Sequence, residues 1–217
     1  MDERRAQLFA LARATKGFMP DDEGEALYGA ALEAGRAVPD ATLVEVGAWC
    51  GKSTLYLAAA AEATGSVVLS VDHHHGSEEQ QEGWEHFDPE LVDAYDGRLN
   101  TLPTWQRTIG AAGLEGSVVG LVGESTTVAS RVRPGLALCF IDGGHGEEPA
   151  WGDYRAWTPL IAAGGLLCLH DVFEDPEDGG RPPYELYCEA IATSYDDVSR
   201  TGSLRVLRRR SARGAGE

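Results

Sequence analysis

The feature that most constrains the fold of this chain is a regular alternation of short apolar runs with helical patterns. Apolar runs rich in Val, Leu and Ile occupy residues 43–46, 66–71, 118–122, 136–141 and 165–169. Helical spacing of apolar residues covers residues 53–63, 102–112, 126–133, 151–160 and 184–194. Strands joined by helical crossovers form a mainly parallel sheet with helices on both faces. The sequence therefore predicts an α/β protein.

Both ends of the chain add elements to this pattern. Residues 5–16 and the stretch that begins at Pro20 have apolar side chains at helical spacing, so two extra helices are expected within residues 1–40. Residues 197–200 and 203–207 flank a Thr-Gly turn, which predicts a closing antiparallel hairpin. We predict a single domain of residues 1–217 with a seven-stranded, mainly parallel sheet.

The charge of the chain limits its partners. The sequence has 35 Asp and Glu against 18 Lys and Arg, so its formal net charge is −17. Nucleic acids and anionic membranes bind through Lys and Arg, so we expect no nucleic-acid and no membrane partner. Several arginines crowd the end of the chain, where residues 208–217 are expected to form a flexible basic tail.

The cysteines and the N-terminus indicate the compartment. The four cysteines are widely spaced, namely Cys50, Cys139, Cys168 and Cys188. The first residues lack the apolar segment of a signal peptide, and the sequence has no run of apolar residues long enough to span a bilayer. We predict a reduced, cytoplasmic protein without disulfides.

Polar residues and glycines follow each of the five predicted parallel strands. They occupy residues 47–53, 72–75, 123–125, 142–145 and 170–171. In open parallel sheets, ligands bind beyond the carboxyl ends of the strands. These five loops are therefore the candidate ligand-binding segments.

The loop from Gly47 to Ser53 invites comparison with two nucleotide-binding motifs. The P-loop pattern GxxxxGK[ST] has four residues between its glycines, whereas only three separate Gly47 from Gly51. The dinucleotide pattern GxGxxG fails because Trp49 stands at its second glycine. A P-loop phosphotransferase is therefore disfavoured. Asp72 ends the second strand, where an acid can bind both ribose hydroxyls, so an adenosine-containing cofactor is favoured.

Two sequence patterns together resemble a known family. The first is ExGxxxGxS from Glu45 to Ser53, and the second is IDGGH from Ile141 to His145. The second pattern continues with Asp153, Trp157, Leu160, Gly164-Gly165 and His170-Asp171. Over about residues 43–171 the chain resembles the class I S-adenosylmethionine-dependent methyltransferases, in the branch that contains sugar and antibiotic-tailoring O-methyltransferases. This resemblance implies a Rossmann-like methyltransferase domain.

The resemblance also implies how S-adenosyl-L-methionine would bind. Glu45 and Gly47 would border its methionine moiety, and Ser53 would lie near its carboxylate. Asp72 would hold the ribose, and Glu124 with Ser125 would lie at the adenine. Asp142 would lie beside the sulfonium and the incoming acceptor.

Methyl transfer to an alcohol requires a base, a metal ion that acidifies the hydroxyl, or both. His145 is the candidate base, since it follows Asp142 in a loop at the ligand edge; the alternative is a histidine that only hydrogen-bonds the loop backbone. Asp142, His170 and Asp171 are the candidate ligands of Mg²⁺. Related metal-dependent sugar methyltransferases have an acid at the position of His170, and imidazole is a softer ligand than carboxylate.

Residues 73–100 form a long polar insertion that we expect to act as a lid. Its acids, amides and Trp84 could hydrogen-bond and stack on a sugar, whereas a solvated acidic loop is the alternative. Side chains of consecutive extended residues alternate in direction, so His73, His74 and His75 are not expected to close on one ion.

Several functions remain open at this point. The leading one is methylation of a sugar or oligosaccharide hydroxyl, and the resemblance suggests the 1-hydroxyl of a methylmannoside as one such acceptor. A catechol-type O-methyltransferase and a cofactor-binding protein without catalysis are the alternatives. A homodimer is the default expectation for such an enzyme.

Overall fold

A computed structural model, which describes residues 3–38, 40–84, 86–175 and 177–211, shows one sheet of seven strands. The strands are β1 (Thr42–Val46), β2 (Val67–Asp72), β3 (Val118–Val122), β4 (Leu136–Ile141), β5 (Ile161–Leu169), β6 (Tyr195–Thr201) and β7 (Leu204–Arg209). Their order in the sheet is β3-β2-β1-β4-β5-β7-β6. The first five are parallel, whereas β7 runs antiparallel to both of its neighbours.

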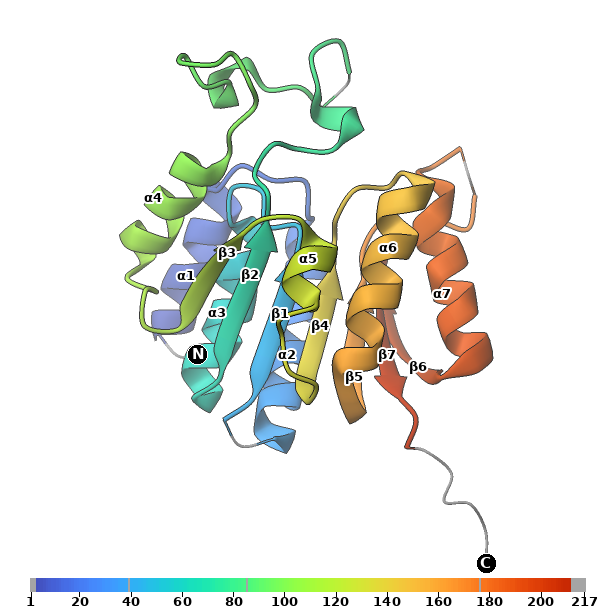
Figure 1. The fold of residues 1–217 in the computed structure, drawn as a ribbon. Helices are drawn as coiled ribbons and strands as arrows, with labels where there is room; N and C mark the ends of the chain where they lie inside the picture. The colour runs from blue at the N-terminus through green and yellow to red at the C-terminus, as the bar shows by residue number, and fades with distance from the viewer. Residues whose placement is uncertain (1–2, 39, 85, 176, 212–217) are drawn as a thin grey trace, which may run out of the picture.

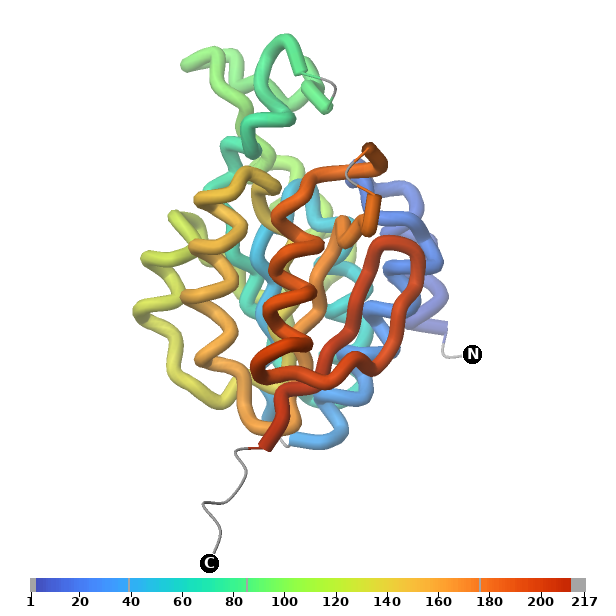
Figure 2. Tube along the Cα trace, turned by 90° about the vertical axis from the view of Figure 1, so that its right-hand side faces the viewer, coloured from blue at the N-terminus to red at the C-terminus, as the bar shows by residue number. Residues whose placement is uncertain are grey.

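Helices cover both faces of this sheet (Figures 1 and 2). They are α1 (Glu3–Ala14), α2 (Asp21–Ala37), α3 (Lys52–Thr64), α4 (Leu102–Ala112), α5 (Ser125–Ala129), α6 (Glu147–Trp157) and α7 (Arg181–Thr193). The 3₁₀ helices are η1 (Glu78–Gln80), η2 (Pro89–Leu91) and η3 (Thr158–Leu160). α1 to α4 pack on one face of the sheet and α5 to α7 on the other.

Alternation of strand side chains builds two hydrophobic cores. Leu43 of β1 and Leu138 of β4 pack toward α1 to α4, and the next residues, Val44 and Cys139, pack toward α5 to α7. All four side chains are fully buried. Successive residues of a strand point to opposite faces, so a strand covered on both sides is apolar throughout.

The two N-terminal helices are part of the first core. The ring of Phe9 in α1 lies 5.0 Å from that of Tyr56 in α3, measured between centroids. α2 approaches α3 closely at Gly24, where a Cβ would lie 2.3 Å from the Tyr56 ring. The packing carries Glu23 of α2 into the interior, where it is 4% exposed.

The predicted α/β class, the closing hairpin and the two N-terminal helices are confirmed. Several element boundaries differ from the prediction, among them those of β5 and α5. β5 begins at Ile161, because this residue pairs with Leu136 ahead of an irregularity in the register. α5 ends at Ala129, short of the predicted residue 133, since the chain turns toward Pro134 and the residue before a proline avoids helical geometry.

The basic end of the chain is more ordered than predicted. Arg208 and Arg209 belong to β7, so a flexible tail that begins at residue 208 is wrong. Arg208 pairs with Glu33 of α2, and Arg210 lies 2.7 Å from Asp196 of β6. Residues 212–217 lie outside the described residues. Arg208 therefore joins the hairpin to α2, and Arg210 joins the end of the chain to β6.

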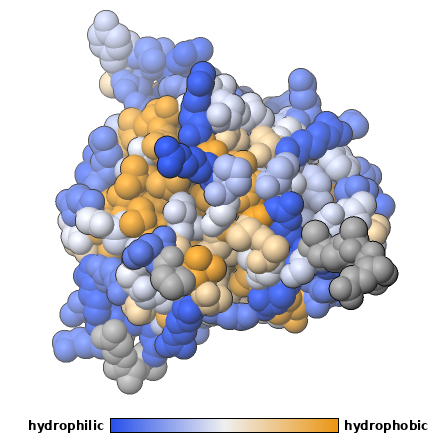
Figure 3. Space-filling model, turned by 60° about the horizontal axis from the view of Figure 1, so that its bottom comes forward, coloured by the Kyte–Doolittle hydropathy of each residue, from blue (hydrophilic) through white to orange (hydrophobic). Residues whose placement is uncertain are grey.

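One part of the sheet is less covered than the rest because α5 is short. Val67 of β2 and Val119 of β3 are 37% and 45% exposed. β2 and β3 lie toward the left of the sheet in Figure 1, and hydrophobic residues gather toward the upper left in Figure 3. Within the described ranges, no helix has the length and apolar character that crossing a membrane requires.

The segment between β2 and α4 stands beyond the carboxyl ends of the parallel strands (Figure 1). It contains η1 and η2 and is tied to the N-terminal part of the chain. The ammonium of Lys16 lies 2.6 Å from carboxylate oxygens of both Asp88 and Glu90. The segment, residues 73–101, therefore lies where a lid would be. We call it the lid segment, and its action as a lid stays a prediction.

Candidate active site

A cavity of about 640 Å³ opens at the carboxyl edge of the sheet. This volume lies in the range of small-molecule sites. Its walls come from residues 16–19, from the loops after β1 to β5, and from the start of the lid segment. Every site residue predicted from the sequence except Glu45 lines this cavity.

The loop after β1 is fixed by close packing against the loop after β4. Gly47 has a φ of +90°, and a Cβ at this position would lie 2.1 Å from the carbonyl oxygen of Asp142. Gly51 has a φ of +95° and forms the N-cap of α3. Only glycine adopts such angles without strain, so the glycines bring the backbone to the cavity wall.

Glu45 lies beneath this loop. It is fully buried, and its carboxylate accepts hydrogen bonds of 2.6 Å from the hydroxyls of Ser53, Thr54 and Ser70. Burial raises the pKa of Glu45 to about 7, although these hydrogen bonds oppose the shift. Glu45 does not line the cavity, and its predicted place beside the methionine moiety of the cofactor stays a prediction. Glu45 instead fixes Ser53 at the start of α3.

Asp72 holds the glycine loop as well as lining the cavity. Its Oδ2 accepts hydrogen bonds from the backbone N–H groups of Ala48 and Trp49, at 2.9 and 2.8 Å. Its Oδ1 accepts one from the N–H of His74, at 2.6 Å. A carboxylate has about four acceptor positions, so Asp72 retains capacity for a ligand in the cavity.

Ser125 and Glu124 lie at the start of α5, on the wall beside β3. The Ser125 hydroxyl accepts a hydrogen bond of 2.7 Å from Trp157 Nε1 and is also bonded to Asp153. Burial raises the pKa of Asp153 to about 6. The Ser125 hydroxyl is therefore hydrogen-bonded to other protein side chains, and Asp153 and Glu124 provide carboxylates on this wall.

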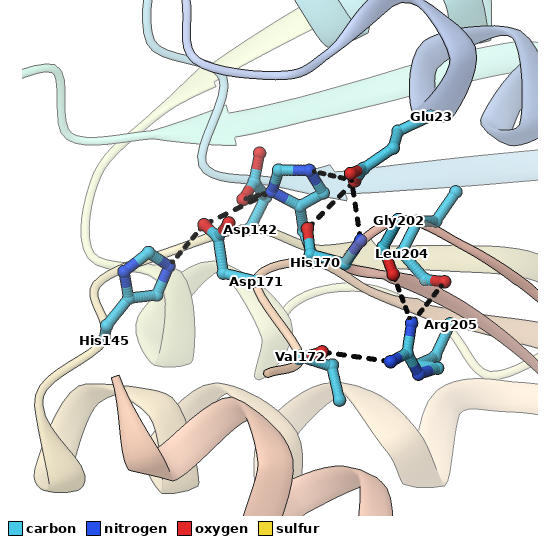
Figure 4. A network of polar contacts seen from close by, with 10 residues as sticks. Glu23, Asp142, His145, His170, Asp171, Val172, Gly202, Leu204 and Arg205 are labelled. Carbon is cyan, nitrogen blue, oxygen red and sulfur yellow. Dashed lines mark hydrogen bonds and ion pairs between the residues drawn. The ribbon is translucent and has the colours of Figure 1, made fainter. Parts of the chain in front are cut away.

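Acids and an imidazole meet where β4 and β5 end. Nδ1 of His170 lies 3.0 Å from Asp142 Oδ1 and 3.3 Å from Asp171 Oδ2. Its Nε2 lies 2.8 Å from Glu23 Oε2, although the N–H is poorly aligned for a hydrogen bond. Figure 4 shows His170 between Glu23 on one side and the two aspartates on the other. Glu23 is itself held by the N–H and the hydroxyl of Ser203, each at 2.9 Å.

His145 lies at the other end of this cluster. Its Nε2 is 3.1 Å from Asp171 Oδ2, and its Nδ1 is 3.2 Å from Glu79 Oε2 in the lid segment. Burial alone would lower the pKa of His145, but the contact and charge of Asp171 outweigh it and raise the pKa to about 9. Both imidazoles in turn hold the pKa of Asp171 below its ordinary range against the effect of burial. In this arrangement His145 carries a proton at neutral pH.

The acid–imidazole cluster has the donors that a divalent cation needs. Asp142, His170 and Asp171 each offer one ligand atom, and these atoms lie within 4.8 Å of one another. Carboxylates suit a hard cation such as Mg²⁺, and imidazole is a common ligand of softer ions. Metal-bound histidines usually place their second nitrogen against a carboxylate, which Glu23 provides for His170. The donor set therefore fits a divalent cation.

The three consecutive histidines have separate surroundings. His73 lines the cavity. His74 is buried, with Nδ1 2.7 Å from the hydroxyl of Thr101, and Nδ1 of His75 lies 2.9 Å from the carbonyl oxygen of Leu99. The three therefore do not converge on one ion, as predicted.

Three residues of this region had no assigned role in the sequence. Glu23 and Glu79 reach the cluster from α2 and the lid segment, and no local pattern marks either position. Asp153 belonged to the family-like pattern but was not assigned to the site. Its place on the inward face of α6 was the available signal.

Comparison with known proteins identifies the family. Residues 44–172, more than half of the chain, match the family described as methyltransferase domain. The matched part runs from within β1 to the residue after Asp171 and so covers β2 to β5 and most of β1. The chain therefore belongs to the methyltransferase domain family, which confirms the resemblance found in the sequence.

Solved structures share the fold. The O-methyltransferase NovP is 18% identical, with 88% of this chain and 81% of that chain covered at a TM-score of 0.64. The O-methyltransferase TomG from Streptomyces achromogenes is 13% identical over 97% and 91%, at 0.61. An O-methyltransferase from Bacillus cereus is 15% identical over 96% and 92%, at 0.62. At these identities the likeness is one of fold.

Proposed function

We propose that this chain is an S-adenosylmethionine-dependent O-methyltransferase that methylates a hydroxyl of a sugar or oligosaccharide. One observation carries the proposal: a single cavity is lined both by the glycine loop with Asp72 and by Asp142, His145 and Asp171. A methyl donor and its acceptor must meet in line, so both need one enclosed space. The family match supports methyl transfer, and the three solved neighbours are named as O-methyltransferases.

The cofactor would lie along the glycine loop. Gly47 allows the backbone to approach it, Ser53 is positioned by Glu45, and Asp72 has a free acceptor position for the ribose. Carboxylates on the cavity wall, which include Asp142 and Asp153, favour a sulfonium cation. The TomG structure contains S-adenosylmethionine and the Bacillus cereus structure contains S-adenosylhomocysteine, which supports this donor.

Asp142, His170 and Asp171 would hold a divalent cation, Mg²⁺ in the first instance. When bound, the cation would lower the pKa of the acceptor hydroxyl. Of the protein groups, His145 would take the hydroxyl proton at Nε2, the nitrogen that now faces Asp171. That role requires His145 to be neutral. During the reaction, the negative charge of Asp171 must therefore be balanced by a group other than His145, so that it no longer raises the pKa of His145.

The cavity rim suits a polyhydroxyl acceptor. Ser77, Glu78 and Gln80 of the lid segment supply a hydroxyl, a carboxylate and an amide to the cavity. Phe18 and Trp49 line it too, with ring centroids 5.8 Å apart, and offer an apolar face to a sugar ring. The 1-hydroxyl of a methylated mannose is the acceptor to test first. The same two aromatic rings would serve a catechol, which keeps a phenolic acceptor as the second candidate.

Incubation with labelled S-adenosylmethionine tests this proposal. Methylated mannose oligosaccharides, unmodified sugars and catechols would be compared with and without EDTA. Label transfer to a sugar that EDTA abolishes and Mg²⁺ restores is expected. Label transfer to catechols alone would show that the acceptor is a phenol and not a sugar. An undiminished rate after thorough metal removal would refute the proposed role of a divalent cation. Binding of S-adenosylhomocysteine in calorimetry without transfer to any acceptor would favour a cofactor-binding protein without catalysis.

The assembly and compartment of the chain remain predictions. We propose a cytoplasmic homodimer with no nucleic-acid or membrane partner. Sedimentation velocity at several protein concentrations would test the dimer, and a single monomeric species throughout would refute it.

A further inference from the structure

His145 is placed between two carboxylates that come from different parts of the chain. Asp171, at the end of β5, lies 3.1 Å from Nε2, and Glu79, in η1 of the lid segment, lies 3.2 Å from Nδ1. The His145 side chain lines the cavity and is 21% exposed, whereas the Glu79 side chain lies outside the cavity lining and is 38% exposed. Nε2 thus faces the cation ligands, and Nδ1 faces the lid.

The lid segment holds Glu79 in a defined position. Ser77 and Gln80 form a capping box around η1, with the Ser77 N–H donating to Gln80 Oε1 at 2.8 Å. The amide of Gln81 donates to the carbonyl oxygens of His75 and Ser77, at 3.0 and 2.9 Å. The short helix that carries Glu79 is therefore held by the side chain of Gln80 and by those of the two residues that flank it.

The same short helix packs against the loop that carries His145. A Cβ added to Gly144 would lie 3.4 Å from the Ser77 Cβ, so there is little free space between the two segments at this point. The approach of Glu79 to His145 is therefore accompanied by a close approach of the two segments that carry them. A contact between two free surface side chains would be weaker, since exposed ion pairs contribute little to stability.

A histidine base works best when its second nitrogen is held. A carboxylate that accepts the Nδ1–H fixes the tautomer with its lone pair on Nε2 and orients the ring toward the proton it removes. It also stabilises the imidazolium that forms. Glu79 stands at the nitrogen where such a group is needed, and Asp171 does not, because it contacts Nε2.

We propose that Glu79 is a positioning residue for His145, so that the lid segment completes the catalytic base. This inference rests on the proposed role of His145. In the reaction, the acceptor oxygen forms a bond to the methyl carbon as the carbon–sulfur bond breaks and leaves S-adenosylhomocysteine. The hydroxyl proton moves to Nε2 of His145, while the Nδ1–H remains bonded to Glu79. Solvent later takes the proton from Nε2.

A double-mutant cycle tests the proposal with labelled S-adenosylmethionine and a methylated mannose oligosaccharide that has a free 1-hydroxyl. Glu79→Ala should lower kcat by about tenfold, with KM and the affinity for S-adenosylhomocysteine changed by less than about twofold. Glu79→Gln should recover most of kcat, because its amide oxygen still accepts the Nδ1–H. Glu79→Ala should cost nothing further in a His145→Ala background. Glu82→Ala is the control, since Glu82 is exposed in the same segment and outside the cavity lining.

A second measurement does not depend on turnover. In protein labelled with ¹⁵N-histidine, the Nδ1 resonance of His145, assigned by its absence from His145→Ala, should move in Glu79→Ala and stay in place in Glu82→Ala. An unmoved resonance would overturn the proposal. A kcat loss that persists in full in the His145→Ala background would also overturn it, since Glu79 would then act on the acceptor directly. Full kcat in His145→Ala would instead refute the proposed base, while the resonance would still report the contact.

Discussion

The two halves of the cavity are built in different ways. On the β1–β2 side, the glycine loop is held by backbone contacts, such as the bonds from Ala48 and Trp49 to Asp72 and the approach of Gly47 to Asp142. On the β4–β5 side, charged side chains come from distant parts of the chain. Glu23 of α2 and Glu79 of the lid segment reach His170 and His145 there.

This difference means that the β1–β2 side of the site is rigid, whereas charge on the β4–β5 side can be redistributed. A loop fixed by steric contact and backbone hydrogen bonds can place a cofactor with one geometry. A chain of carboxylates and imidazoles can redistribute protons and accept a cation, but its geometry depends on every charged member being present. We therefore expect substitutions on the β4–β5 side to act through charge and those on the β1–β2 side through shape.

The largest expected effect is that of Glu23→Gln. Glu23 is buried against His170 and Ser203, and loss of one partner from a buried ion pair costs about 3–5 kcal/mol. We expect a loss of that size in urea denaturation and roughly tenfold weaker Mn²⁺ binding in calorimetry. Glu33→Gln, which breaks an exposed pair with Arg208, should cost less than about 1 kcal/mol. Equal losses in the two variants would show that burial of the Glu23 pair does not matter.

Gly47→Ala tests the shape of the other half. The new Cβ would overlap the Asp142 carbonyl at a backbone φ of +90°, and such strain costs roughly 1–3 kcal/mol. We expect this loss in denaturation together with weaker binding of S-adenosylhomocysteine. Gly29→Ala is the matched control, because Gly29 lies in α2 and a Cβ added there would meet no atom within 4 Å. It should stabilise the protein by up to about 1 kcal/mol. A Gly47→Ala variant with unchanged stability would mean that the two loops separate readily.

The same contrast explains what the sequence could predict. The strands, the glycine loop and Asp72 are encoded by local patterns, and the parallel topology then brings Asp142, His170 and Asp171 together at one edge. The burial of Glu45 could not be predicted, because an acid that lines a cavity at a strand end and a buried acid look alike in a sequence. The contacts of Glu23 and Glu79 depend on how α2 and the lid segment pack, which no spacing reveals. The order of Arg208 and Arg210, which were assigned to a flexible tail, could not be predicted for the same reason. Their partners, Glu33 and Asp196, lie in α2 and β6.

The pH dependence of stability sharpens the role of Glu45. Its pKa in the folded protein is about 7, against an ordinary 4.5, so folding favours the protonated acid. The contribution is full below about pH 4.5 and is lost as pH rises through 7. This difference in pKa corresponds to at most about 3 kcal/mol, and relaxation of the site will reduce this contribution. Denaturation of wild type and Glu45→Gln from pH 5 to 8 should show a steeper decline for wild type. Parallel curves would contradict a buried neutral Glu45.

The smallest expected effects separate the two halves functionally. His145→Ala should lower kcat by at least about tenfold, or 1.4 kcal/mol, and leave the affinity for S-adenosylhomocysteine unchanged. Asp72→Asn should do the reverse, because it weakens the hydrogen bonds that set the shape of the glycine loop while the β4–β5 side stays intact. Calorimetry on both variants would measure the affinity for S-adenosylhomocysteine, and initial rates would measure kcat. If His145→Ala weakened the cofactor analogue as much as Asp72→Asn did, the proposed division of the cavity would be wrong. Asp142 would be the expected link between the halves, since its carbonyl contacts the glycine loop and its carboxylate contacts His170.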